Sequence, residues 1–424
     1  MSIRIKGEVK MKKILIFLLL FVFAIGLCSC GGQEVSTSED TSDTTEPTKV
    51  MKLIADSEGT KYSIIVPKGL DYLKKAAEKL EAASCDATGK CIYVKNDTGT
   101  KINEYEILVG LTNREESTSV SQGLGKDEYL IKWQGEKLCV GAGSNYAAKA
   151  GVLWLYENYF KDAKDSISIP EDLLERGNSG VNYELKDLKA GWNSLVYPTS
   201  NDIEMKCQIR MPNNYDSSKE YPCILYMHSA GVRKYDNEHI YQGEAAFLRN
   251  LEAGKYRNDV IVIAPFCPEE DKWVPVNSWK ADAYDFANAK PTKHMEGAME
   301  LFNLAREKLS IDDSRLYLYG MSMGGFASHY YIARQSGLFA AVITAAGAGD
   351  PSAVSNYEGT AVWMFHGTND SVVPYNSMIR MKEAFDAIGR TDILYTTFEG
   401  EDHGIWSKTA NTEGLYDWLF SKKR

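Results

Sequence analysis

The residues with the clearest capacity for chemistry in this chain are a serine, an aspartate and a histidine that lie far apart in the sequence. Ser322 is the centre of the segment Gly-Met-Ser-Met-Gly at residues 320–324. A serine hydroxyl is a weak nucleophile, so it needs a base, and the base needs an acid that orients it. Asp370 and His403 follow in the order acid and then histidine. The three residues therefore predict a catalytic triad for acyl transfer, with Ser322 as nucleophile, His403 as base and Asp370 as acid.

The prediction for Ser322 depends on the elements around it, because the pattern Gly-x-Ser-x-Gly alone is weak evidence. Residues 316–319 have the apolar pattern of a buried strand, and residues 325–334 have helical periodicity. A strand, a sharp turn and a helix are what place a nucleophile at the tip of the turn. Asp370 follows another predicted strand and His403 follows the next one. Asp350, after the preceding strand, is the alternative acid.

Acyl transfer also needs backbone N–H groups that bind the developing oxyanion. One is expected from Met323, directly after the nucleophile. The other is expected from the loop after the predicted strand 223–227, where Ser229 or Ala230 is the donor. His228 opens this loop, and we interpret it as a brace for the loop rather than as a base.

Aromatic side chains near these segments are candidate contacts for a sugar or an aromatic acyl group, because amphipathic rings suit such ligands. The candidates are Trp273, Trp279 and Trp406, with Tyr284 beside them. Packing in the core or at its rim is the open alternative for each. The spacing of His and Cys predicts no metal site, and the mechanism needs no cofactor.

Residues 182–424 alternate between strand-like and helical segments, which predicts a mostly parallel sheet covered on both faces. Catalytic groups of such sheets gather at the carboxyl ends of the strands. The predicted strands are 205–210, 223–227, 260–264, 315–319, 341–345, 361–365 and 393–398. The best helical periodicity is at 293–309, 325–334, 377–388 and 412–420.

Several of these segments together resemble the α/β-hydrolase superfamily, and within it the branch of feruloyl and acetylxylan esterases, some of which are labelled predicted peptidases. The segments are Tyr221-Pro222, residues 228–231, 264–268, 320–325 and 366–370, and His403-Gly404. The resemblance covers nearly all of residues 200–424. It implies a doubly wound α/β-hydrolase fold and a serine carboxylic-ester hydrolase. One departure is Ser229, where relatives usually carry glycine.

Residues 51–178 predict a separate small α/β domain, with strand-like runs at 62–66, 91–95, 105–110, 128–133 and 137–141 and helical runs at 70–83 and 145–160. Its aromatic residues are expected to face the core. Residues 106–110 and 141–152 resemble the non-catalytic N-terminal domain found before some polysaccharide-degrading enzymes, such as α-glucuronidases and hexosaminidases.

The first thirty residues are expected to be an export signal. Lysines at 10, 12 and 13 precede the apolar run 14–27, which is shorter than the ~20 residues that span a bilayer. Leu27, Ser29 and Cys30 resemble a bacterial lipoprotein signal, which would make Cys30 the lipid-modified N-terminus. A plain secreted protein and a transmembrane helix are the alternatives. A start at Met11 would remove residues 1–10 and leave the rest of the signal unchanged. Residues 31–50, rich in Ser, Thr and acidic residues, predict a disordered tether.

The composition argues against nucleic acid as a partner and leaves the disulfide state of some cysteines open. The formal net charge of −10 argues against nucleic acid, which needs clustered Lys and Arg. A membrane contact is expected only through the N-terminal anchor. Cys85 and Cys91 flank a short turn that a disulfide would close. The remaining cysteines, at positions 139, 207, 223 and 267, are expected to be buried free thiols.

Taken together, the sequence predicts an exported serine hydrolase that cleaves carboxylic esters, with acetyl or feruloyl esters of plant polysaccharide as the expected substrates. A serine peptidase, or an esterase for unrelated small esters, is the alternative. A surface glycan-binding lipoprotein with an inactive hydrolase domain is a further alternative. The sequence leaves open which ester is cleaved, what residues 51–178 do, and the oligomeric state.

Overall fold

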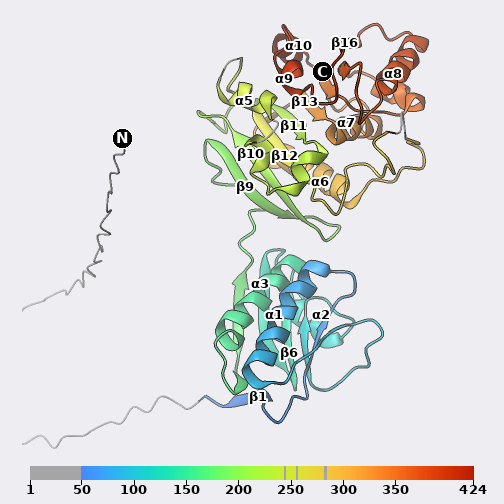
Figure 1. The fold of residues 1–424 in the computed structure, drawn as a ribbon. Coiled ribbons are helices and arrows are strands. Elements are labelled where there is room, and N and C mark those ends of the chain that lie inside the picture. Colours follow the sequence, from blue (N-terminus) through green and yellow to red (C-terminus); the bar gives the residue numbers. More distant parts are fainter. Residues whose placement is uncertain (1–48, 243–244, 255, 281–283) are drawn as a thin grey trace, which may run out of the picture. The chain divides into compact units, whose positions relative to one another are not determined.

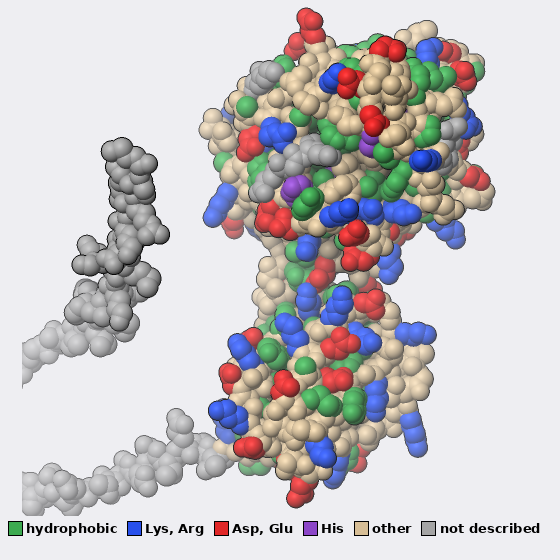
Figure 2. Space-filling model, in the orientation of Figure 1, with side chains coloured by type: hydrophobic (Ala, Val, Ile, Leu, Met, Phe, Trp, Pro, Cys, Tyr) green, Lys and Arg blue, Asp and Glu red, His purple; other side chains and the backbone are tan. Residues whose placement is uncertain are grey.

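The computed structural model describes residues 49–242, 245–254, 256–280 and 284–424 (Figure 1). The expected signal segment, Cys30 and most of the expected tether lie outside these residues, so those expectations stay predictions. Residues Lys49–Arg424 form one compact unit. Among the residues described, no helix combines the length and the hydropathy that a membrane crossing requires. On the face drawn in Figure 2, acidic side chains lie among basic ones.

The C-terminal residues build an eight-stranded sheet that is mostly parallel. Its order is β16-β15-β14-β13-β11-β12-β10-β9, and the pairs β12–β10 and β10–β9 are antiparallel while the others are parallel. Central strands such as β12 and β14 are buried along their whole length, as expected for a sheet covered on both faces. The strands are β9 (Gly191–Pro198), β10 (Glu204–Met211), β11 (Tyr221–Met227), β12 (Ile261–Pro265), β13 (Ile311–Met321), β14 (Ala341–Ala345), β15 (Ala361–Gly367) and β16 (Leu394–Phe398).

Helices cover both faces of this sheet, and each face has its own apolar core (Figure 1). One core includes Phe302, Phe326 and Met378, and the other includes Phe247 and Leu415. The predicted α/β class with a doubly wound, mostly parallel sheet is confirmed. The helices are α4 (His239–Gln242), α5 (Ala246–Glu252), α6 (Lys293–Lys308), α7 (Met323–Arg334), α8 (Asn376–Ala387), α9 (Trp406–Ala410) and α10 (Leu415–Ser421), with 3-10 turns η2 (Ala230–Lys234) and η3 (Pro351–Tyr357).

The N-terminal residues form a second α/β sheet with a separate apolar core. Its order is β3-β2-β4-β6-β5-β8, and β1 pairs with β7 outside it. The strands are β1 (Met51–Asp56), β2 (Ser63–Val66), β3 (Val94–Asn96), β4 (Glu106–Val109), β5 (Glu128–Gln134), β6 (Lys137–Ala142), β7 (Ser166–Pro170) and β8 (Leu174–Asn178). The helices are α1 (Asp71–Thr88), α2 (Glu115–Ser121) and α3 (Asn145–Leu155), and a π-helical turn, η1 (Tyr156–Phe160), continues α3.

The cysteines divide as the sequence predicts. Cys85 and Cys91 form a disulfide that links the end of α1 to the segment leading into β3. The remaining cysteines in the described residues are buried and free: Cys139, Cys207, Cys223 and Cys267.

Candidate active site

Ser322 occupies a strained turn between β13 and α7. Its backbone has φ of 52° and ψ of −121°, a conformation that residues other than glycine rarely adopt. The N–H of Ser322 donates to the carbonyl oxygen of Ala345 on β14 at 2.8 Å, which fixes the turn to the neighbouring strand. The strain is thus held by the sheet, and it places the side chain at the carboxyl end of a central strand.

The glycines around Ser322 are required by close backbone contacts. A Cβ at residue 320 would lie 2.1 Å from the carbonyl oxygen of Gly324. A Cβ at residue 324 would lie 1.9 Å from the carbonyl oxygen of Met227, at the end of β11. Both distances are far below van der Waals contact, so larger residues would push α7 away from the sheet.

The structure brings Ser322, Asp370 and His403 into one hydrogen-bonded chain. His403 Nε2 lies 2.8 Å from Ser322 Oγ, and His403 Nδ1 lies 2.8 Å from Asp370 Oδ2 and 3.0 Å from its Oδ1. An ionised carboxylate only accepts, so Nδ1 carries the proton and donates it to Asp370. Nε2 is then free to accept from the serine hydroxyl. This is the arrangement needed to deprotonate Ser322 during an attack on a carbonyl carbon.

The carboxyl group of Asp370 is buried and accepts several hydrogen bonds that keep it ionised. Burial by itself would raise the pKa of this carboxyl group, but hydrogen bonds from His366, His403 and the N–H of Val373 lower it well below the ordinary value for aspartate. Asp370 Oδ1 accepts from the N–H groups of Val372 and Val373 at 2.9 and 2.8 Å. The carboxylate therefore stays charged and oriented toward His403.

His366 is a site residue that the sequence analysis did not assign. It is buried at the end of β15, and its Nε2 lies 3.2 Å from Asp370 Oδ2 and 3.0 Å from the carbonyl oxygen of Val373. Nε2–H thus faces two acceptors. One feature of the sequence could have indicated this contact. His366 lies four residues before Asp370, at the end of the strand that leads to it.

Asp350, the alternative acid, has a different task. Its Oδ1 accepts from the N–H of Ser352 at 2.9 Å and caps η3, and its Oδ2 accepts from the N–H of Phe286 at 2.7 Å. Both carboxylate oxygens of Asp350 are engaged with backbone, whereas His403 contacts Asp370.

The loop after β11 lies against the nucleophile turn, as the contact between residues 227 and 324 requires. Met323 is the first residue of α7 and Ala230 the first of η2, so the N–H of each lacks a partner within its own helix. Ser229 is buried and precedes Ala230. The N–H groups of Met323 and of residues 229 and 230 therefore stay candidates for the predicted oxyanion hole.

His228 is fully buried and braces this loop. Its Nε2 accepts from the N–H of Cys267 at 3.0 Å, so Nδ1 holds the proton and donates to the carbonyl oxygen of Ser229 at 2.8 Å. Burial lowers the pKa of His228 to about 4, which keeps the ring neutral. A neutral ring with both nitrogens bonded to backbone is a structural support for residues 228–230.

The three predicted tryptophan contacts have different environments. Trp273 is fully buried, and its Nε1–H donates to the carbonyl oxygen of His228 at 3.3 Å, so the prediction that it contacts substrate is wrong. Trp406 is 9% exposed and packs edge-on against His403 at 5.2 Å between ring centroids. Trp279 is half-buried and packs edge-on against Phe326 on α7. Of these three tryptophans, Trp279 is the one that is not buried.

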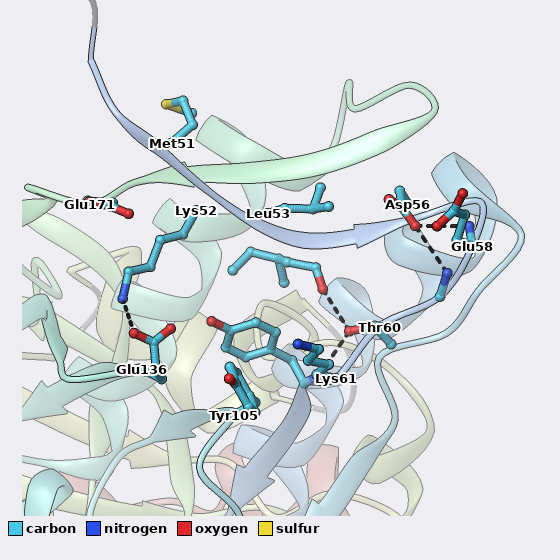
Figure 3. A pocket seen from close by; sticks show the side chains of 13 residues that line it. Met51, Lys52, Leu53, Asp56, Glu58, Thr60, Lys61, Tyr105, Glu136 and Glu171 are labelled. Carbon is cyan, nitrogen blue, oxygen red and sulfur yellow. Dashed lines mark hydrogen bonds and ion pairs between the residues drawn. The ribbon is translucent and has the colours of Figure 1, made fainter.

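A pocket of about 690 Å³ lies in the N-terminal sheet region, and none of the triad residues lines it (Figure 3). Lys52 and Glu136 point toward each other across it and pair at 2.9 Å, and the ammonium group of Lys61 lies over the ring of Tyr105 at 5.1 Å. The charged groups of Lys52, Glu136 and Lys61 therefore engage other pocket residues. Among the described residues that line it there is no serine, cysteine or histidine. The described part of the chain also contains no cluster of three or more metal-binding side chains.

Comparison with known families and proteins gives the following matches. The model of the family named Esterase matches residues 199–413. Dipeptidyl peptidase 4 of Bos taurus is 21% identical over 266 residues, which cover 55% of this chain and 33% of the relative. The same enzyme of Felis catus is 19% identical over 408 residues, which cover 85% and 49%. This chain thus spans between a third and a half of the curated relatives it matches.

Several solved structures are also similar. A thermostable esterase has a TM-score of 0.49 at 23% identity, with 61% of this chain and 69% of that chain covered. A ferulic acid esterase from Anaeromyces mucronatus, solved with ferulic acid, has a TM-score of 0.39 at 17% identity, with 56% and 92% covered. Est1E from Butyrivibrio proteoclasticus has a TM-score of 0.39 at 13% identity, with 55% and 98% covered.

Proposed function

Because the chain belongs to the Esterase family, we propose that its C-terminal part is a serine hydrolase that cleaves carboxylic esters through an acyl-enzyme. The observation that carries the proposal is the chain of hydrogen bonds from Asp370 through His403 to Ser322, with 2.8 Å at each link. A nucleophile, a base and an oriented acid at these distances are what acyl transfer requires.

In the proposed mechanism His403 Nε2 takes the proton of Ser322 Oγ as the oxygen attacks the ester carbonyl carbon. The oxyanion is bound by the N–H of Met323 and by an N–H of the loop after β11, from Ser229 or Ala230. Each such donor stabilises the transition state by about 3 kcal/mol. His403 then returns the proton to the leaving alcohol, and water releases the acyl group by the same steps. Asp370 orients the imidazole and stabilises its protonated form.

We propose carbohydrate-linked esters, with acetyl or feruloyl acyl groups, as the substrate class. The half-buried rings of Trp279 and Tyr284 support this choice, because both pack against Phe326, four residues beyond the nucleophile on α7. Partly exposed aromatic rings that pack against the first turns of α7 would suit a sugar or an aromatic acyl group. Ferulic acid is the ligand named with one of the similar structures.

A serine peptidase is the second candidate, favoured by the similarity to dipeptidyl peptidase 4. Release of acid from acetylated xylan and from methyl ferulate, compared with cleavage of a dipeptide p-nitroanilide, separates the two. We expect the esters to be cleaved at least tenfold faster in kcat/KM, and the Ser322→Ala variant to cleave none of the three. Faster cleavage of the anilide would assign the chain to the peptidases. Folded protein that cleaves none and resists fluorophosphonate labelling would leave a non-catalytic glycan-binding role.

We further propose that the protein is exported and anchored through a lipid on Cys30. The supporting observation is the order of a basic segment, an apolar run and Leu-Cys-Ser-Cys in residues 10–30. In a bacterial host, the full chain should enter the detergent phase of a Triton X-114 partition and the Cys30→Ala variant the aqueous phase. Equal partition of both would exclude the anchor.

A further inference from the structure

One carboxylate outside the triad joins the loop that carries the acid to the loop that carries the base. Asp402 Oδ1 accepts from the N–H of Ser371 at 2.8 Å and from the N–H of His403 at 2.7 Å. The hydroxyl of Ser371 donates to the same carboxylate at 2.9 Å. Ser371 directly follows Asp370, so a single oxygen ties the backbone beside the acid to the backbone of the base.

The other contacts between these two loops stop short of the acid. The N–H of Thr368 donates to the carbonyl oxygen of Phe398 at 3.1 Å, and the N–H of Asn369 donates to that of Glu401 at 3.0 Å. These backbone bonds continue the pairing of β15 with β16 through residue 369. Beyond residue 369, the hydrogen bonds between the two loops among the described residues are of two kinds. One is the contact of Asp370 with His403, and the other is the set made by the carboxylate of Asp402.

The surroundings of Asp402 suit a role in positioning the two loops rather than in packing of the apolar cores. Its side chain is exposed, whereas Asp370 is buried. The backbone hydrogen bonds from Ser371 and His403 lower the pKa of Asp402, so the carboxylate is ionised and its hydrogen bonds are charge-assisted. Removing an exposed side chain deletes no apolar contact of the two cores. The effect of losing Asp402 should therefore fall on the geometry of the two loops.

We propose that Asp402 is a positioning residue that holds the His403 loop against the Asp370 loop, so that the imidazole reaches Ser322 and Asp370 at the same time. The inference rests on the proposed function, since it explains how His403 is held in the position that catalysis requires. A displacement of about 1 Å in a reacting group costs on the order of 100-fold in rate. Loss of this joint should thus lower kcat more than it raises KM.

The variants Asp402→Ala and Asp402→Asn test the proposal in the full chain. Asp402→Ala should lower kcat for methyl ferulate by about 10- to 100-fold with KM within about twofold. Asp402→Asn keeps an oxygen that accepts from both N–H groups, so it should recover most of the wild-type kcat. The matched control is Glu401→Ala, which removes the neighbouring carboxylate, paired with Lys408, and leaves the backbone carbonyl in place. Its kcat should stay within about twofold of wild type.

Amide hydrogen exchange gives a second measurement that needs no turnover. In Asp402→Ala the segments 367–373 and 399–405 should both exchange at least tenfold faster than in wild type, while Glu401→Ala exchanges like wild type. A wild-type kcat in Asp402→Ala, a slow Asp402→Asn variant, or unchanged exchange would each overturn the proposal. If the wild-type chain cleaves no ester, the proposed function fails, and the exchange comparison alone decides whether Asp402 joins the loops.

Discussion

Nε2 of His366 lies 3.2 Å from Oδ2 of Asp370, the oxygen that also contacts His403 at 2.8 Å. The acid of the candidate triad thus faces two histidines. Only His403 contacts Ser322, at 2.8 Å. His366 comes from the end of β15 and points its N–H at the carboxylate and at the carbonyl oxygen of Val373. It therefore acts on the base through the acid, by favouring the ionised carboxylate in one orientation.

Replacing His366 should lower activity at neutral pH. In His366→Leu the carboxylate loses a donor that lowers the pKa of Asp370 and fixes its orientation. The carboxylate should then orient the imidazole of His403 less strictly, and kcat/KM at pH 7 should fall about tenfold. His366→Gln keeps an N–H donor and should lose less activity. A wild-type kcat/KM at pH 7 in His366→Leu would contradict this role.

Removing the nucleophile should abolish turnover and spare the fold. Ser322→Ala deletes only a hydroxyl, so kcat for ester hydrolysis should fall by on the order of 10⁵ or more while the melting temperature changes little. A fluorophosphonate probe should label the wild type and leave Ser322→Ala unlabelled. Labelling of the variant at another residue would show that the nucleophile had been misassigned.

The glycine at position 324 should be intolerant of a methyl group. In Gly324→Ala the new Cβ would lie 1.9 Å from the carbonyl oxygen of Met227, so α7 and β11 must separate. We expect a loss of several kcal/mol in the free energy of unfolding, or insoluble protein. Gly404→Ala is the matched control, because a Cβ there meets nothing within 4 Å. Equal stability of the two variants in urea titrations would contradict the close packing at the turn.

Stability should fall as the pH is lowered from about 6.5 toward 4. Burial lowers the pKa of His228 to about 4, below the roughly 6.5 of an unfolded chain. Between these values the unfolded state binds the proton more strongly, so the stability from the neutral ring is complete above pH 6.5 and is lost as pH falls through 4. The loss is about 3 kcal/mol in total.

Urea unfolding at pH 7 and pH 5 measures this effect. His228→Gln should be less stable than wild type at pH 7 and should lose less stability between the two pH values. Some dependence will remain, because burial also lowers the pKa of His329, to about 3. A variant whose stability falls as steeply as that of wild type would exclude His228 as the cause.

The disulfide between Cys85 and Cys91 should stabilise the N-terminal sheet region. It closes a short loop, so the double variant Cys85→Ala and Cys91→Ala should lose about 2 kcal/mol in the free energy of unfolding. Alkylation of unreduced, denatured protein should modify the buried free thiols and leave these two cysteines unmodified. Modification of Cys85 or Cys91 before reduction would contradict the bridge.

The sequence predicted the strands and helices around the nucleophile because their determinants are neighbours in the chain. The strand before Ser322, the glycines and the helix after it are contiguous, and the apolar run 341–345 coincides with β14. Edge strands were missed where the burial alternates weakly. β9 is such a strand, since it pairs on one side only and most of its residues are only partly buried or exposed. The helical run 145–160 was predicted with its full extent, but not the π-helical geometry of its last five residues.

The sequence was enough to predict the triad residues of the candidate site, but only some of the residues that hold them in place. The order of Ser322, Asp370 and His403 indicated a triad, because each follows a strand of one sheet and parallel strands present their carboxyl ends together. The contact of His366 with Asp370 depends on how residues 370–373 turn back, which no local pattern specifies. Trp273 shows the converse error. An aromatic residue in a loop suggested a ligand contact, but the loop packs it under His228.

The backbone conformation at residue 322 also restricts which nucleophilic residue types can occupy this position. With φ of 52°, a side chain branched at Cβ would be a steric outlier. Threonine carries the same hydroxyl as serine, yet its extra methyl group excludes it from this position. Serine and cysteine, which place a nucleophilic atom on an unbranched Cβ, are the residue types that remain. The choice of reactive group in this protein is therefore constrained by one torsion angle as well as by chemistry.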